Sequence, residues 1–312
     1  FASGKTLSVE QAFEVPAGKQ MTITGAAGTL TLGDNMSLTG TLNLAVEDAI
    51  LSSGSLTLNG GLLEVSEDAS ISSAVIQKVS SEFSVATGKT LSYTGSSFDI
   101  SAYTLTLSGG GNFQSGGLDL NNANSKLLLS SITVDSVSTR VDNSLGIDVD
   151  NDSTITSLSV ANITPVSIAS GKTLSGGITV SAGSLKLTEA GTLASRVSMS
   201  GGVLDADNSS TVSGTLSHTA DITIDVANNK TLTYTGAPIS LGANTLTLSG
   251  GGSLVSGGVT LNNANSKLLL NSITLDNATT SADSLGLDVD NNSTITALSV
   301  GHITPVSIAA GS

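Results

Sequence analysis

The sequence TLTLSGGG occupies residues 104–111 and returns unchanged at residues 245–252, at an offset of 141. The sequence NNANSKLLL follows at 121–129 and returns at 262–270 with the same offset. Each copy sets alternating apolar and small polar residues beside a run of glycines or asparagines. Alternation with period two is typical of half-buried strands, and Gly and Asn favour tight corners. The repeated unit is therefore predicted to consist of short β-strands joined by corners.

The repeat extends well beyond these two motifs. Residues 55–65 align with residues 196–206 at the same offset of 141. ITPVSIA at 163–169 matches 303–309 at an offset of 140, so the second copy lacks one residue that the first has near Asn143. A fixed long period is typical of stacked repeat architectures.

We interpret the chain as a little over two copies of a unit of about 141 residues. Copy A covers about residues 30–171 and copy B about residues 172–312, and residues 1–29 form part of a preceding coil region.

The junction between the copies decides between tandem β-sandwich domains and one solenoid. Residues 165–187 run through this junction in the same alternating style, and they contain no linker. A solenoid needs no linker, because each coil packs only on its neighbours. We therefore predict an all-β fold, a single continuous parallel β-solenoid (β-helix) over residues 1–312. At about 20–24 residues a coil, it has about 13–15 coils.

The composition favours a narrow aliphatic interior. Hydrophobic residues make up 38% of the chain, which is too much for disorder, whereas aromatic residues make up only 3% and Trp is absent. We expect stacked Leu, Ile and Val inside, little room for Tyr, and outward Thr and Ser that hydrogen-bond along the stack. Helical periodicity is not sustained anywhere, and only SVEQAFEV at 8–15 suggests a helical turn.

The repeated asparagines are predicted to be structural corners. In this interpretation the corner is followed by Lys126, which stays in solvent, and by Leu127–Leu129, which contribute to the apolar ladder. Asn side chains at matching corners of successive coils could also form amide ladders. The corner asparagines are Asn121, Asn122 and Asn124 in the first copy and Asn262, Asn263 and Asn265 in the second.

One acidic motif resembles the start of a calcium-binding loop. Alternating carboxylate oxygens on a tight loop are typical Ca²⁺ ligands. The motif lacks the turn glycine and the final glutamate of an EF-hand, so an Asp-rich solenoid corner is the other interpretation. The candidate ligands are Asp148, Asp150 and Asp152 in DVDNDST and Asp288, Asp290 and Asn292 in DVDNNST.

The sequence gives little support for catalysis. His218 and His302 are not repeated in the other copy, Cys is absent, and no nucleophile elbow or phosphate-binding loop is found. The aromatic residues do not cluster along the sequence, and we interpret them as packing or surface positions. We predict that the protein is not an enzyme and has no cofactor apart from possible Ca²⁺. A polysaccharide-cleaving β-helix is the third alternative, and it would need clustered acids with basic or aromatic sugar contacts.

Net charge and hydropathy limit the partners. The formal net charge of −14 argues against nucleic acid or anionic lipid, because phosphate binding needs a basic patch. No run of 18 apolar residues is present, so no membrane-spanning helix is predicted.

With its Gly-punctuated strings TLTLSGGG, SLTLNGG and VSGGVTLNNANS, the whole chain resembles the repetitive regions of bacterial surface β-solenoids. These include filamentous-haemagglutinin-like exoproteins, autotransporter passengers and long repeat adhesins. The resemblance lies in composition and repeat style, and no functional motif is matched. It implies export, an extracellular or cell-surface location, and a structural or adhesive role.

The two ends share one repeat phase, since FASGKTLS at 1–8 matches 168–175 and the sequence stops in the same phase at Ser312. We expect the end coils either to stack head-to-tail on copies of the same protein or to continue in a longer chain. The expected function is a structural rod of an extracellular filament, stalk or surface layer. The alternative is the stalk or binding region of a surface adhesin with a glycan or cell-surface ligand.

Overall fold

The computed structural model describes residues 2–52, 54–95, 97–142 and 144–309. Asn143, where the second copy lacks a residue, and the terminal residues Phe1 and Ser312 fall outside these ranges. The described residues form strands and turns and no helix. The helical turn expected at 8–15 is wrong, because these residues lie in two strands and their connection, and both strands pair with strands of the next turn of the chain.

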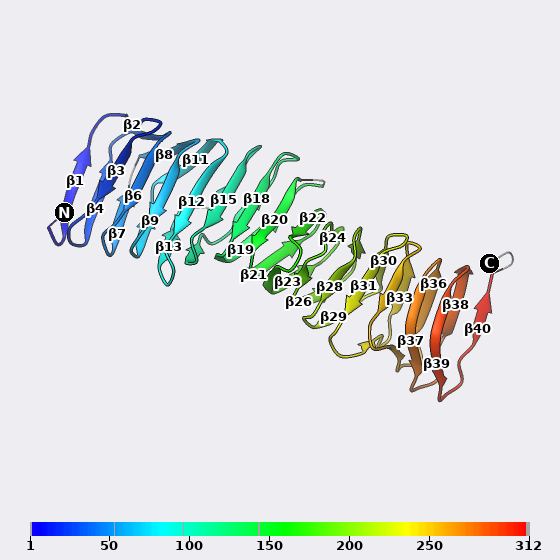
Figure 1. Ribbon diagram of the computed structural model, residues 1–312. Coiled ribbons are helices and arrows are strands. Elements are labelled where there is room, and N and C mark those ends of the chain that lie inside the picture. Colours follow the sequence, from blue (N-terminus) through cyan, green and yellow to red (C-terminus); the bar gives the residue numbers. More distant parts are fainter. Residues whose placement is uncertain (1, 53, 96, 143, 310–312) are drawn as a thin grey trace. The chain divides into compact units, whose positions relative to one another are not determined.

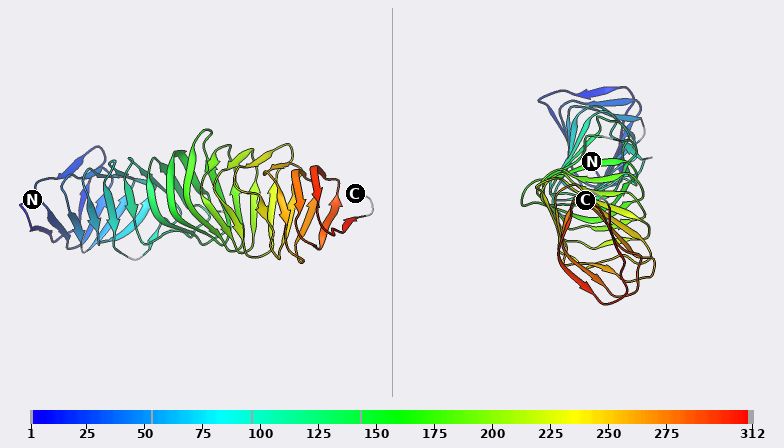
Figure 2. Two further views of the ribbon diagram at one scale, coloured as in Figure 1. Left: turned by 90° about the horizontal axis from the view of Figure 1, so that it is seen from below. Right: turned by 90° about the vertical axis from the view of Figure 1, so that its right-hand side faces the viewer.

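The chain forms two compact units, Phe1–Leu158 and Ser159–Ser312, and the division falls within strand β21 (Ser153–Val160). In each unit the backbone winds in successive turns, and each turn pairs in parallel with the next (Figure 1). Figure 2 shows equivalent strands of successive turns side by side within each unit. These are the features of a parallel β-solenoid.

Each turn crosses up to three sheets, named A, B and C. Sheet C has one strand per turn. In the first unit its strands are β3 (Gln20–Ile23), β6 (Thr41–Leu44), β9 (Leu62–Val65), β12 (Ser81–Val85), β15 (Thr104–Ser108), β18 (Lys126–Ser130) and β20 (Gly146–Asn151). In the second unit they are β22 (Ile163–Ile168), β24 (Ser184–Leu187), β27 (Val203–Ala206), β30 (Ile222–Val226), β33 (Thr245–Ser249), β36 (Lys267–Asn271), β38 (Gly286–Asn291) and β40 (Val306–Ile308).

Sheet A follows sheet C along each turn. In the first unit its strands are β1 (Lys5–Val9), β4 (Gly28–Leu32), β7 (Ala49–Ser52), β10 (Ala69–Ile71), β13 (Thr90–Tyr93), β14 (Phe98–Asp99), β16 (Asn112–Gln114), β17 (Leu118–Leu120), β19 (Thr133–Thr139) and β21. In the second unit they are β23 (Thr173–Val180), β25 (Thr192–Leu193), β26 (Arg196–Met199), β28 (Ser210–Val212), β29 (Leu216–His218), β31 (Thr231–Tyr234), β32 (Ile239–Ser240), β34 (Ser253–Val255), β35 (Val259–Leu261), β37 (Thr274–Thr280) and β39 (Thr294–Val300). Sheet B closes the early turns with β2 (Phe13–Val15), β5 (Asn35–Leu38), β8 (Ser55–Asn59) and β11 (Ala74–Val79).

The sheet C strands of the described residues number 15, which gives about 15 turns and confirms the predicted solenoid of 13–15 coils. Val289 pairs in register with Ile308 across a short turn of this sheet, and Phe83 pairs with Leu107 across a longer one. One turn therefore takes about 19 to about 24 residues, and the predicted length of about 20–24 residues is nearly right.

A ladder of apolar side chains fills the interior. Each position in sheet C pairs in register with the same position of the next turn, so inward residues stack directly on one another. Burying a Leu or Val side chain contributes about 1.5–3 kcal/mol, and this gain recurs at every turn. One ladder of the first unit, in which no member is more than 1% exposed, consists of Leu42, Leu63, Phe83, Leu107, Leu129 and Val149.

The interior of the first unit also holds an aromatic cluster, which the sequence interpretation did not expect. Phe83 packs edge-on against Phe98 with ring centroids 5.9 Å apart, and Phe113 and Tyr93 complete the group at 5.7 and 5.9 Å. All four side chains are buried. Phe83, Tyr93 and Phe98 belong to one turn and Phe113 to the next, so positions scattered along the sequence meet in the core. The expectation that the aromatic residues do not cluster is therefore wrong, although their role is packing, as expected.

Candidate functional site

The asparagine corners are local turns closed by a buried serine. The Asn122 side-chain oxygen accepts a hydrogen bond from the backbone N–H of Asn124 at 2.9 Å. The Ser125 hydroxyl accepts from the Asn122 N–H at 3.0 Å and donates to the Ser101 carbonyl of the preceding turn. Ser125 is fully buried. The corner thus fixes its own shape and ties itself to the turn before it, which is a structural role.

The second copy repeats this corner. Asn263 and Asn265 form the same side-chain-to-backbone bond at 2.9 Å, and Ser266 reaches the Gly242 carbonyl at 2.5 Å. An amide-to-amide bond of the kind expected for a ladder joins Asn291 to Asn271 at 2.6 Å, outside the predicted corners.

Lys126 is not a free solvent-exposed residue, contrary to expectation. Its ammonium group forms an ion pair with Asp148 of the next turn, and its side chain is 29% exposed. The second copy repeats the pair between Lys267 and Asp288 at 2.5 Å. Gly146, which has no side chain, lies in register opposite Lys126 on the next strand. The pair therefore connects two turns on the outer face of sheet C.

The D-x-D-x-D motif lies mainly on a strand instead of a loop. Asp148 and Asp150 both belong to β20, and Asp152 follows it. Residues two positions apart on a strand have Cα atoms about 6.6 Å apart, and an extended strand does not wrap its side chains around an ion as a tight Ca²⁺ loop does. Asp288 and Asp290 lie in the same way on β38.

In the part of the chain that the structure describes, no group of three or more acidic or His side chains is arranged to hold a metal ion. Ca²⁺ binding by these residues stays an untested alternative.

A carboxylate clamp that sequence reasoning missed recurs in both units. The Asp135 carboxylate accepts hydrogen bonds from the backbone N–H groups of Ser115 at 3.0 Å and Gly116 at 3.1 Å, one turn earlier. Gly116 and Gly117 have φ of 65° and 145°, which glycine adopts without strain. The sequence pattern that could have predicted this clamp is Ser-Gly-Gly followed by an Asp one turn later. Ser115 and Asp135 are 20 residues apart.

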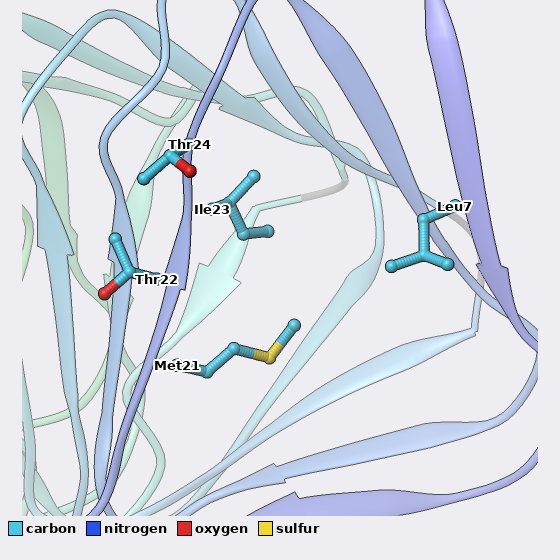
Figure 3. A pocket seen from close by; sticks show the side chains of 5 residues that line it. All are labelled: Leu7, Met21, Thr22, Ile23 and Thr24. Carbon is cyan, nitrogen blue, oxygen red and sulfur yellow. The ribbon is translucent and has the colours of Figure 1, made fainter. Parts of the chain in front are cut away.

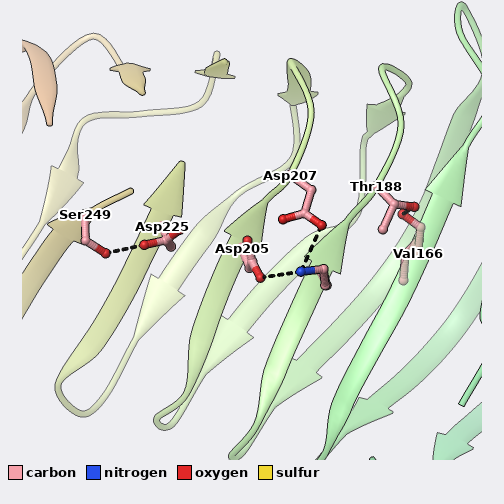
Figure 4. A network of polar contacts seen from close by, with 7 residues as sticks. Val166, Thr188, Asp205, Asp207, Asp225 and Ser249 are labelled. Carbon is pink, nitrogen blue, oxygen red and sulfur yellow. Dashed lines mark hydrogen bonds and ion pairs between the residues drawn. The ribbon is translucent and has the colours of Figure 1, made fainter. Parts of the chain in front are cut away.

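A polar network on the outer face of sheet C in the second unit centres on Lys186. Its ammonium group lies 2.8 Å from Asp207 and 3.3 Å from Asp205, and Ser249 donates a hydrogen bond to the neighbouring Asp225 (Figure 4). The hydrogen bond to Asp207 raises the pKa of Lys186, and burial opposes this effect. Burial raises the pKa of Asp205 more than the Lys186 charge lowers it. Asp207 is therefore the main partner of Lys186, while Asp205 is a desolvated neighbour.

The two histidines are not brought together into a site. The ring nitrogens of His218 lie 3.1 Å from the carbonyl oxygens of Ala220 and Ser240, which ties it to the following turn. His302 is half-exposed and lies 3.7 Å from Asp283. Gln77, the repeat counterpart of His218, donates to the Thr104 carbonyl at 2.8 Å.

The two terminal turns expose the apolar interior. At the first turn, Leu7, Met21 and Ile23 line an open hollow of about 360 Å³ (Figure 3), and Leu7 is 47% exposed. At the last turn, Val306 is 56% and Ile308 67% exposed. Both faces consist of inward-pointing ladder residues with no turn beyond them among the described residues.

Comparisons with known proteins found no matching family model, no matching curated protein and no matching solved structure. The described part of the chain contains no helix that is long and apolar enough to cross a membrane. The fold defines the class as a parallel β-solenoid, and the function is inferred from its surfaces.

Proposed function

We propose that this protein is a structural element of an extracellular filament, stalk or surface layer. In this role the protein acts as a stiff rod of stacked turns, and the same repetition would let another copy or continuing chain add further turns. At about 4.8 Å per turn, about 15 turns would span about 70 Å.

The observation that supports this role most directly is the in-register ladder of buried apolar residues. Leu105 and Leu107 stack on Leu127 and Leu129 in the first unit, and the identical sequence repeats the stack in the second. Each turn presents the same interior to the next, so the architecture extends by repetition. Corner serines, carboxylate clamps and Lys–Asp pairs join successive turns, which favours a rigid stack.

The extracellular location rests on the resemblance to bacterial surface solenoids. The same resemblance supports a second candidate, the binding region of an adhesin. One surface feature favours it: a shallow groove of about 350 Å³ on sheet A, where the side chains of Asp68, Ser70 and Ser92 lie near the exposed Ile50. Screening the purified chain on a glycan array tests this candidate, and binding lost on Ser70→Ala and Ser92→Ala would favour it.

Small-angle X-ray scattering of the purified chain tests the structural role. A rod predicts an elongated particle about 70 Å long, whereas a compact scattering profile would contradict the proposal. Immunogold labelling of the source cells tests the location. Label along filaments or at the cell surface is expected, and label confined to the cell interior would exclude it.

A further inference from the structure

We propose that the groove on sheet A of the first unit binds a short glycan that carries free amino groups. This inference rests on the binding role given above as the second candidate function, and it names the ligand class of that groove. The charge of the groove, the paired strands beneath it and a comparison with the second unit each contribute one step.

The groove crosses three successive turns of the first unit, and two rows of side chains line it. At a strand separation of about 4.8 Å, three strands span about 10 Å, which is long enough for two sugar rings. Its volume of about 350 Å³ lies at the lower end of the range for small-ligand sites. The two rows are Asp48, Asp68 and Thr90 beside the corner, and Ile50, Ser70 and Ser92 on strands β7, β10 and β13.

The charge of the groove favours a cation. Asp48 and Asp68 both line it, and none of the described residues that line it is basic. Lys89 of the same corner forms an ion pair with Glu67. The hydrogen bond to Glu67 raises the pKa of Lys89, and the charges of Asp68 and Glu47 add to this effect. An ammonium group that enters the groove would be attracted by the same carboxylates.

The sheet beneath the groove favours a glycan over a basic peptide. β10 is paired with β7 on one side and with β13 on the other, so its backbone groups are engaged within sheet A. An extended peptide binds mainly through backbone hydrogen bonds at an open sheet edge, which this groove does not offer. The hydroxyl groups of Ser70, Thr90 and Ser92 can donate to sugar hydroxyls and accept from them. Ile50 is 40% exposed and offers an apolar contact for the C–H face of a sugar ring.

The second unit shows that the stack does not require the carboxylate of Asp68. Ser209 stands at the repeat position of Asp68. Its hydroxyl accepts a hydrogen bond from the Thr231 N–H at 3.1 Å, and Asp68 accepts the equivalent bond from the Thr90 N–H at 2.7 Å. Asp68→Ser should therefore remove the charge from the groove and keep the corner hydrogen bond.

A matched pair of sugars tests the charge requirement. The disaccharide of glucosamine and its N-acetylated form share one ring skeleton, and only the first carries ammonium groups. At slightly acidic pH both the sugar amines and the aspartates are charged, and NMR titration with the glucosamine disaccharide should shift the amide signals of Ser70 and Ser92. The N-acetylated form should bind at least about fivefold more weakly, because each exposed ion pair contributes up to about 1 kcal/mol.

Variants of the groove provide the second measurement. Asp68→Ser should weaken binding of the glucosamine disaccharide about threefold, and Asp48→Asn combined with Asp68→Ser about tenfold. Ser209→Asp is the matched control, because it adds a carboxylate at the equivalent position of the second unit, and it should leave the shifts in the first unit unchanged. Asp150→Asn removes one exposed charge from the first unit outside the groove, and it should bind like the natural chain.

Each outcome decides the proposal. Shifts at Ser70 and Ser92 that Asp68→Ser weakens and Asp150→Asn does not weaken support it. Equal binding of the N-acetylated sugar, or equal weakening by Asp150→Asn, overturns the requirement for an amine in this groove. Equal binding of spermidine, which has amines and no sugar ring, overturns the glycan class, as does tighter binding of a lysine-rich peptide.

Failure of this inference can be distinguished from failure of the proposed functions. Binding of a different glycan at the same serines would overturn the amine-bearing class and leave the adhesin candidate in place. Absence of any glycan binding would overturn both the inference and the adhesin candidate. Neither result changes the rod, which the scattering experiment tests separately.

Discussion

The carboxylate of Asp135 accepts a hydrogen bond from the backbone N–H of Ser115, 3.0 Å away and one turn earlier in the stack. The same carboxylate accepts from the Gly116 N–H, and Asp276 repeats both contacts with Ser256 and Gly257 at 3.0 Å. One acidic side chain in each unit thus binds two backbone N–H groups of a glycine corner on the preceding turn.

Replacing Asp135 by Ala should therefore destabilise the first unit by about 2–3 kcal/mol, because hydrogen bonds to charged groups contribute about 1.5–3 kcal/mol. Urea unfolding measures the loss, and hydrogen exchange should show faster exchange of the Ser115 and Gly116 amides. Asp150→Ala is the control on the same unit, since Asp150 is exposed, and it should stay within about 0.5 kcal/mol. Unchanged exchange at Ser115 would show that the clamp contributes little.

The aromatic cluster gives a second test, because the second unit fills the same space without it. Ile224, Ile239 and Leu254 stand at the repeat positions of Phe83, Phe98 and Phe113. Phe98→Ile alone should cost about 1–3 kcal/mol through the void that it leaves. The triple variant carries Phe83→Ile, Phe98→Ile and Phe113→Leu. Its loss in the free energy of unfolding should be at least about 1 kcal/mol smaller than the sum of the three single losses, because the effects of substitutions at contacting residues are not additive. Urea unfolding of the four variants measures this, and simple additivity would contradict shared packing.

The fold could be predicted from the sequence because its signal is repeated. The alternating residues 104–107 and 55–58 form most of β15 and β8. The offset of 141 between the copies predicts that equivalent residues occupy equivalent positions in two turns of the stack. Alternation predicts which side chains point inward. Leu127 and Leu129 are buried in the ladder as predicted, whereas Leu128 between them is only half-buried, so the prediction for Leu128 is wrong.

The contacts between turns could not be predicted in the same way. Whether Lys126 reaches Asp148, or Phe83 meets Phe113, depends on turn lengths that differ from one turn to the next. A shift of one residue would turn a side chain from the core to solvent. The D-x-D-x-D motif was ambiguous for a related reason. The same spacing of aspartates occurs in Ca²⁺-binding loops and on the solvent-facing side of a strand.

The geometry of that motif leads to a third prediction. Asp148 is already paired with Lys126, and Asp150 lies two residues further along the same strand. Millimolar Ca²⁺ should therefore leave the melting temperature unchanged. Calorimetric titration should likewise show no binding heat. A rise of several degrees that disappears in Asp150→Asn would instead establish a Ca²⁺ site on β20. Mg²⁺ at the same concentration controls for ionic strength.

The last prediction concerns the pH dependence of the second unit through Asp205. Burial raises the pKa of this carboxyl group in the folded protein above the ordinary value of 3.8, despite the nearby Lys186 charge. The folded state therefore binds the Asp205 proton more tightly than the unfolded state does. Its charged form destabilises the fold at neutral pH, and this penalty disappears as the pH falls through the folded pKa towards 3.8.

Asp205→Asn removes the titrating group but keeps an oxygen that can accept from Lys186. The natural chain should therefore gain stability relative to Asp205→Asn as the pH is lowered from about 7 to below about 4, and thermal unfolding of both proteins across this range measures the difference. Asp225→Asn, the in-register neighbour on β30, controls for general loss of negative charge. If Asp205→Asn instead gains on the natural chain as the pH falls, attraction to Lys186 outweighs burial, and Asp205 is a stabilising partner of the network.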